Sequence, residues 1–187
     1  MKSFSLALIL ALSCAPAGPI LGPGPVEAFC WISAGNPDGG ANATATISAP
    51  LGQSFVPCED GIITNITAQV GGGSGPSHIL GLQTGTDLLA PIYTQAGSIL
   101  PGNSRIVFNP GFPVASGVVY SFSLTPVSGV LRLIQVDPLL YAGGTMLQVV
   151  EGVSVPRPAD LLFSMVISDP PVPTSIVTWG QIKSTYR

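Results

Sequence analysis

The chain has 187 residues, which is enough for one ordinary domain, and only 8% of them are charged. Six lysines and arginines cannot neutralise a run of phosphates, which argues against a nucleic-acid binder. With 46% hydrophobic residues, 23 glycines and 19 prolines, the composition also argues against a disordered chain or a helical bundle. We therefore expect a small domain rich in β-strands and turns.

Residues 1–28 have the features of an export signal. One lysine precedes an apolar run from Phe4 to Ser13, which has the length of a signal-peptide core and is too short to span a bilayer. We expect cleavage after Ala28, with Ala17 as the alternative, and a lipoprotein signal ending at Cys14 is a third interpretation. No other stretch reaches the length of a transmembrane helix, so we predict a secreted or cell-surface protein.

Export makes the cysteines informative. Removing or lipidating Cys14 leaves Cys30 and Cys58 as an even pair in an oxidising compartment. We predict a disulfide between them, which ties a Gly- and Asn-rich arm, residues 29–49, to the start of the core. The alternative is two free, buried thiols. Two cysteines and one histidine argue against a zinc site.

Residues 50–168 have the pattern of short strands separated by turns rich in Gly, Pro, Asn and Ser. The clearest strand is 118–125, in which every second residue faces a core and the others face the opposite way. The core-facing residues are Val118, Tyr120, Phe122 and Leu124, and the others are Val119, Ser121, Ser123 and Thr125. Further strands are expected at 44–47, 52–57, 62–70, 79–83, 92–95, 105–109, 130–136, 145–150 and 161–168. No helical crossover separates the strands, so the sheets are antiparallel. The predicted fold is an all-β, antiparallel two-sheet β-sandwich that is jelly-roll-like.

The C-terminal end differs from this pattern. Residues 169–173 are a proline-rich linker, and residues 174–187 are a cationic tail with two aromatic side chains. We predict that the tail docks on another surface. The alternative is a chain end that packs loosely on the sandwich. The candidate docking residues are Trp179, Ile182, Lys183, Tyr186 and Arg187.

Three motifs carry a resemblance. Residues 52–55 read Gly-Gln-Ser-Phe, residues 114–122 read Val-x-x-Gly-x-x-Tyr-x-Phe, and residues 137–145 read Asp-Pro-Leu-Leu-Tyr-Ala-Gly-Gly-Thr. Over residues 50–168 the chain resembles a jelly-roll-like β-sandwich module of exported bacterial surface proteins. The third motif departs from that module by two leucines between its proline and its tyrosine. The resemblance implies a non-catalytic accessory or adhesion module outside the cytoplasm.

The residues do not form a catalytic constellation. No nucleophile elbow occurs, and the single histidine, His78, is interpreted as a surface residue at the edge of a strand. The acidic residues lie mostly beside Gly, Pro or loop residues and are interpreted as turn residues rather than a catalytic pair. We therefore predict that the chain is not an enzyme and needs no cofactor. Calcium is the one metal retained, with Asp38 and Asp137 as candidate ligands and plain turns as the alternative.

Two functional classes remain. The first is a binding or adhesion module whose partner is a glycan or another surface protein. The second is a structural component of the cell surface or of an assembly that docks through the tail. Sugar binding needs exposed aromatic rings beside polar groups. The Tyr141 side chain has an alternative role as a plug at the end of the sandwich. The candidate binding residues are Trp31, Tyr93, Asp137, Tyr141, Gly143 and Gly144.

Overall fold

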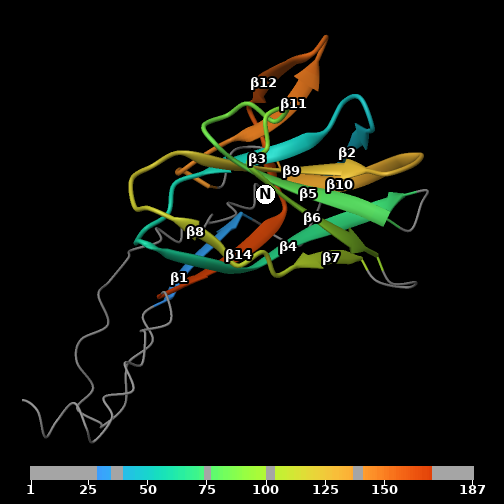
Figure 1. Ribbon diagram of the computed structural model, residues 1–187. Coiled ribbons are helices and arrows are strands. Elements are labelled where there is room, and N and C mark those ends of the chain that lie inside the picture. Colours follow the sequence, from blue (N-terminus) through green and yellow to red (C-terminus); the bar gives the residue numbers. More distant parts are fainter. Residues whose placement is uncertain (1–28, 35–39, 74–76, 100–103, 137–140, 170–187) are drawn as a thin grey trace, which may run out of the picture.

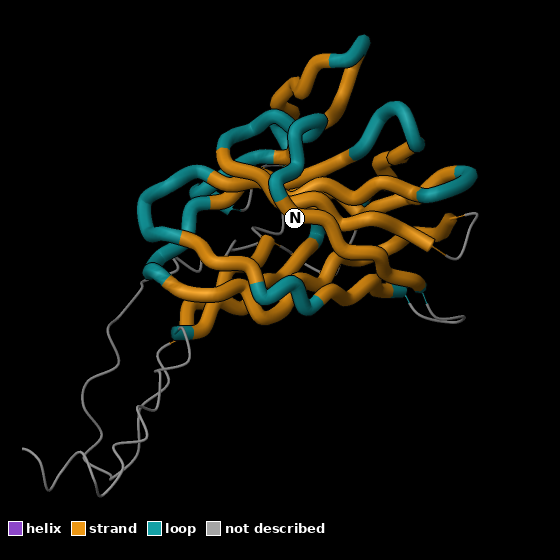
Figure 2. Tube along the Cα trace, in the orientation of Figure 1, coloured by secondary structure: helices purple, strands orange, loops and turns teal. Residues whose placement is uncertain are grey.

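The computed structural model describes residues 29–34, 40–73, 77–99, 104–136 and 141–169 (Figure 1). In these ranges every regular element is a β-strand, and the strands form two antiparallel sheets packed against each other (Figure 2). The predicted all-β, two-sheet sandwich is therefore confirmed. The predicted signal and tail lie outside the described residues, as does nearly all of the linker. No helix in the described part of the chain is long and apolar enough to cross a membrane.

The first sheet is organised around its longest strand, β4, which pairs with four neighbours. Its main path runs in the order β1 (Phe29–Ala34), β14 (Phe163–Ser168), β4 (Gly61–Gly73), β10 (Val130–Val136) and β13 (Asp160–Leu161). Three further strands join this path: β2 (Ala41–Thr46) pairs with β10, whereas β7 (Arg105–Phe108) and β8 (Phe112–Val114) pair with β4.

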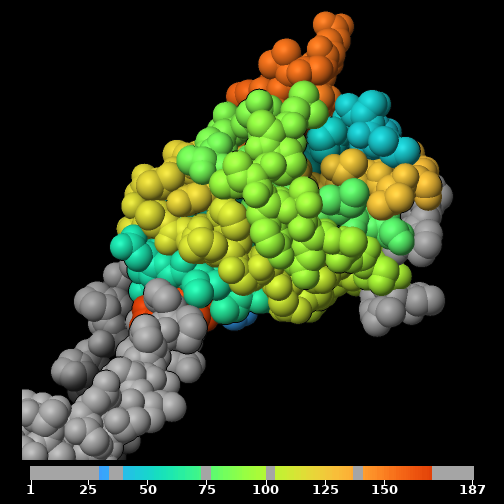
Figure 3. Space-filling model, viewed as in Figure 1, coloured from blue at the N-terminus to red at the C-terminus, as the bar shows by residue number. Residues whose placement is uncertain are grey.

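The second sheet has six strands in the order β12 (Val153–Arg157), β11 (Met146–Val150), β3 (Leu51–Phe55), β9 (Tyr120–Pro126), β5 (Ser77–Thr84) and β6 (Tyr93–Ser98). The hairpin of β11 and β12 projects from one end of the molecule (Figure 3). The chain passes from one sheet to the other at most of its connections, which is the crossing pattern expected of a jelly-roll-like sandwich.

The core lies between the two sheets. On β9 the predicted inward side chains Tyr120, Phe122 and Leu124 are buried, and the Phe122 ring lies 5.3 Å from that of Phe163 across the core. The prediction is wrong for Val118, which lies before the strand begins and is exposed. The prediction that β9 is only half-buried is wrong, because Ser121 and Ser123 on its outer face are also buried.

The segment 85–92 explains this second layer of burial. It lies over the outer face of the second sheet, where Pro91 and the Ser123 hydroxyl both approach Gly81 closely. The Ser121 hydroxyl donates a hydrogen bond to the Gly85 carbonyl at 2.7 Å. This layer includes a small buried cluster separate from the main core, formed by Leu88, Leu147 and Val149.

The N-terminal segment is more ordered than a loose arm. Residues 29–34 form β1, which pairs along its whole length with β14 as an edge strand of the described sheet. Cys30 and Ile32 point into the core, so the strand has one buried face. The predicted disulfide is confirmed: Cys30 is bonded to Cys58, with their Cα atoms 6.1 Å apart, and this joins β1 to the turn before β4.

Removing this cross-link should destabilise the fold. Replacing both Cys30 and Cys58 with serine is expected to lower the free energy of unfolding by about 3–4 kcal/mol, because the bond closes a long loop in the unfolded chain. Urea denaturation of the full chain measures the change. As a control, a reducing agent should destabilise the wild type and leave the double variant unaffected. Equal stability of the wild type with and without reductant would contradict the prediction.

Candidate functional site

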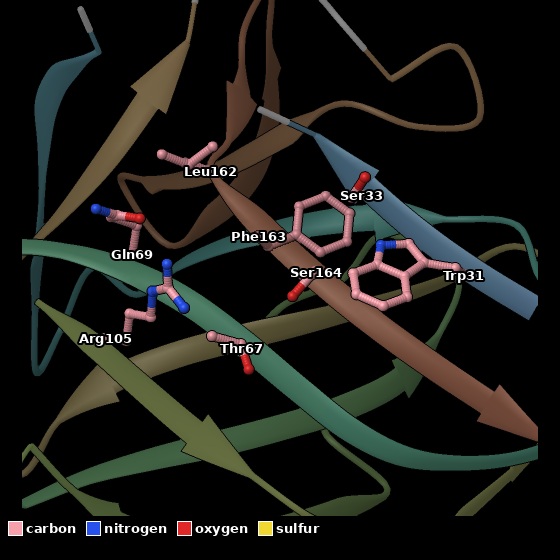
Figure 4. Close-up of a pocket in the computed structure, with 8 residues that line it drawn as sticks. All are labelled: Trp31, Ser33, Thr67, Gln69, Arg105, Leu162, Phe163 and Ser164. Carbon is pink, nitrogen blue, oxygen red and sulfur yellow. The ribbon is translucent and has the colours of Figure 1, made fainter. Parts of the chain in front are cut away.

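The outer face of the first sheet contains a hollow of about 310 Å³ (Figure 4). This volume lies at the small end of the range for ligand pockets, about 300–1,000 Å³. Four strands, β1, β14, β4 and β7, contribute side chains to it, and the segment before β14 closes one end. The lining residues are Trp31, Ser33, Thr67, Gln69, Arg105, Leu162, Phe163 and Ser164.

Strand alternation places these side chains. On β1 the neighbours of Trp31 face the core, so Trp31 and Ser33 face outward. In the antiparallel register Ser33 lies opposite Ser164, and Ser164 lies opposite Thr67 on β4. A row of three small hydroxyl side chains therefore crosses the sheet. Because these three side chains are short, they form the floor of the hollow, and the larger side chains around them form its walls.

An aromatic and a cationic side chain stand on opposite sides of this row. The Trp31 side chain is 54% exposed on β1. On the other side Arg105 of β7 pairs with Gln69 of β4 and is also exposed. Within the described residues the Arg105 guanidinium has no hydrogen-bond or ion-pair partner, and no acidic residue lines the hollow. The site thus offers an apolar ring, hydroxyls, an amide and an unpaired cation.

The structure does not bring the other aromatic candidate to this site. Tyr93 lies on β6 of the second sheet, where its ring packs 5.8 Å from that of Phe112. Both rings are partly buried against the main core. Trp31 and Tyr93 therefore cannot contact the same small ligand.

The contacts of Tyr141 match its alternative role as a plug. Its hydroxyl accepts a hydrogen bond from the Val56 amide at 3.1 Å and donates one to the Val56 carbonyl at 3.3 Å. Its ring meets that of Phe163 edge to face at 6.0 Å. Gly143 and Gly144 are required by packing. A Cβ on Gly143 would collide with the Tyr141 hydroxyl, and a Cβ on Gly144 would collide with the Ser54 carbonyl.

The calcium candidates and the docking tail are not placed by this structure. Asp38 and Asp137 both lie outside the described residues, as do the tail residues Trp179, Ile182, Lys183, Tyr186 and Arg187. No group of three or more His, Cys, Asp or Glu side chains suited to a metal occurs in the part of the chain that is described.

Asp160 and Gln53 form a buried polar pair that was not predicted from the sequence. Asp160, interpreted above as a turn residue, is fully buried in β13. Its Oδ1 accepts a hydrogen bond from Gln53 Nε2 at 2.8 Å, and its Oδ2 accepts one from the Tyr141 amide at 2.8 Å. Gln53 Oε1 in turn accepts a hydrogen bond from the Leu161 amide at 2.9 Å. This pair links the two sheets and is not at the hollow.

The prediction for His78 is also wrong in part. It is fully buried on β5 and does not lie at the surface. It points to the same face as Leu80 and Leu82, both of which belong to the core. Neither ring nitrogen has a hydrogen-bond partner in the described structure. Burial lowers the pKa of His78 below its ordinary value of 6.5, because the charged ring would lose its hydration.

In comparisons with known proteins, no protein-family model and no curated protein matches the chain. The fold itself, an all-β antiparallel sandwich, is compatible with the module that the three motifs resemble. Membership in a module of exported surface proteins stays a prediction.

Tyr141 should act in folding and not in ligand binding. Changing Tyr141 to Phe removes the hydroxyl but keeps the ring, and leaves the Val56 amide without its side-chain acceptor. We expect the free energy of unfolding to fall by about 1 kcal/mol, with the binding of any ligand unchanged. Urea denaturation measures the free energy of unfolding, and titration with a ligand, where a screen has identified one, measures binding. Loss of binding at unchanged stability would show that Tyr141 is a ligand contact.

Burial of His78 should make stability depend on pH. Because its pKa is lowered, the unfolded chain binds a proton that the folded chain rejects, so stability falls as the pH drops below about 6.5. The variant His78→Leu has no such group. The stability of this variant relative to the wild type should therefore increase as the pH is lowered from about 7.5 to about 5.

The comparison with the variant isolates this effect from that of Glu59. Burial and the neighbouring Asp169 raise the pKa of Glu59, so its contribution to stability is lost as the pH rises through that value. Glu59 is present in both proteins and cancels in their difference. Chemical denaturation at several pH values measures that difference, and a pH-independent value would refute the assignment.

Proposed function

We propose that this chain is an exported, non-catalytic glycan-binding module and that the hollow on the first sheet is its binding site. The observation that carries the proposal is the exposed indole of Trp31 beside a polar floor. A sugar ring has an apolar face that packs on an aromatic side chain, while its hydroxyls need polar partners. The hollow provides both kinds of contact side by side.

The floor suits hydroxyl-rich ligands. Ser33 and Ser164 carry hydroxyl groups that can each donate and accept a hydrogen bond, as sugar hydroxyls also do. The Thr67 hydroxyl donates to Asn65 Oδ1 at 3.0 Å and offers a ligand an acceptor. Gln69 adds an amide with both a donor and an acceptor group. A purely apolar ligand would desolvate these groups without replacing their hydrogen bonds to water, at a cost in affinity. The composition of the floor therefore favours a saccharide over a lipid or an apolar peptide.

Export is part of the same proposal. The disulfide between Cys30 and Cys58 supports an oxidising compartment, because such bonds persist mainly in secreted and cell-surface proteins. The apolar N-terminal segment supports it from the sequence. Glycans are abundant outside the cell, so the proposed location and the proposed ligand are consistent with each other. The alternative of docking through the tail rests on residues that lie outside the described structure.

Substitution of Trp31 tests the proposal. We expect the full chain to bind a subset of an oligosaccharide array, and Trp31→Ala to weaken that binding by about tenfold or more. Trp31→Phe keeps an aromatic face and should retain part of the affinity. Because the Trp31 side chain is exposed, Trp31→Ala should change the free energy of unfolding by no more than about 0.5 kcal/mol.

A matched control removes an exposed apolar side chain elsewhere. Ile92 is 66% exposed and lies just before β6 of the second sheet, away from the hollow. Ile92→Ala should leave both the array pattern and the affinity unchanged. Absence of binding to any saccharide by the folded wild-type chain, or equal binding by wild type and Trp31→Ala, would contradict the proposed site.

A further inference from the structure

We propose that the hollow selects acidic saccharides, with the carboxylate of a uronic-acid residue beside Arg105 and a neighbouring sugar ring on Trp31. This inference rests on the proposed function and specifies its ligand class. It is drawn from the charge and the spacing of the side chains that line the hollow.

Arg105 is a cation without a counter-charge. The described residues contain three arginines and no lysine, and one of the three, Arg157, is hydrogen-bonded to Gln148. Arg105 lines the hollow, has no partner within the described structure, and faces no acidic residue there. A guanidinium binds a carboxylate through two parallel hydrogen bonds, which neutral sugar hydroxyls cannot match. The free guanidinium therefore favours a ligand that carries a carboxylate.

The spacing across the sheet requires a ligand longer than one ring. Trp31 and Arg105 lie on β1 and β7, with β14 and β4 between them, and the register offsets them by four residues along the strands. Three strand spacings of about 4.8 Å and an offset of about 13 Å place their backbones about 19 Å apart. Figure 4 shows the indole reaching from β1 toward β14 and the guanidinium lying close to β4. The polar floor of Ser33, Ser164 and Thr67 occupies the distance between them. A short oligosaccharide can contact the ring and the cation together.

Charge also indicates how acidic the ligand is. The hollow has a single cation, and the whole chain has a formal net charge of −3. A densely sulfated polymer would be repelled by the chain as a whole and would find only one charge to neutralise. A uronic acid places one carboxylate on a sugar residue, which matches a site with one guanidinium. We therefore assign the anion as a carboxylate and not as a cluster of sulfates.

Titration calorimetry of the full chain with three matched trisaccharides tests this. One contains a uronic-acid residue, the second has that carboxyl reduced to a hydroxymethyl group, and the third is sulfated. We expect the wild type to bind the uronate at least about tenfold more tightly than the reduced sugar, as a charge-assisted hydrogen bond provides. Arg105→Gln should lose that preference and keep the affinity for the reduced sugar.

Two variants make the result specific. Arg132 is an exposed arginine of the same sheet, on β10, and does not line the hollow, so Arg132→Gln should leave the preference intact. Arg105→Lys keeps the charge without the bidentate geometry and should show an intermediate preference. Circular dichroism confirms that each variant is folded.

The outcomes separate the two proposals. Equal affinity for the uronate and the reduced sugar, or a preference that survives Arg105→Gln, overturns this inference and leaves glycan binding intact. Tightest binding of the sulfated sugar overturns the assignment of a carboxylate. Failure of all three sugars, together with an empty glycan array, overturns the proposed function itself.

Discussion

A buried carboxylate, that of Asp160, determines how the two sheets are aligned against each other. Asp160 on β13 receives a hydrogen bond from Gln53 on β3 of the opposite sheet, and a second from the Tyr141 amide. A carboxylate taken out of water costs several kcal/mol unless such donors are present. Apolar contacts tolerate small sliding movements, whereas a shift between the sheets here would break the hydrogen bond between Asp160 and Gln53. This pair therefore specifies the alignment of the sandwich as well as contributing to its stability.

The motifs that drew attention in the sequence meet around the same pair. Next to Gln53, the Ser54 hydroxyl accepts a hydrogen bond from the Thr145 amide at 2.9 Å, and the Tyr141 hydroxyl contacts the backbone at Val56. The Gly-Gln-Ser-Phe strand and the Tyr-Ala-Gly-Gly-Thr loop are thus two halves of one packing unit. Their residue types are explained by folding, since small residues allow close backbone approach and polar ones satisfy buried groups. The hollow, by contrast, lies on residues outside these motifs.

Sequence patterns predicted most of the fold and one residue of the site. The strand Val130–Val136 has the predicted bounds, because its residues have strong β-propensity between clear turns. The short strands β8 and β12 were missed, since Pro113 and Pro156 weaken a strand signal. Trp31 was a candidate from its residue type alone. Arg105 was not, because the register that brings it near the hollow joins strands far apart in sequence.

The position of the disulfide also has a mechanical consequence. Cys30 immediately precedes Trp31 on β1, an edge strand of the described sheet that pairs only with β14. Tension applied to β1 would tend to peel an edge strand away one hydrogen bond at a time. The covalent link to Cys58 instead passes that load directly to the turn before β4, the central strand of the sheet. The cross-link therefore protects β1 against forces that pull on the N-terminal end of the sheet.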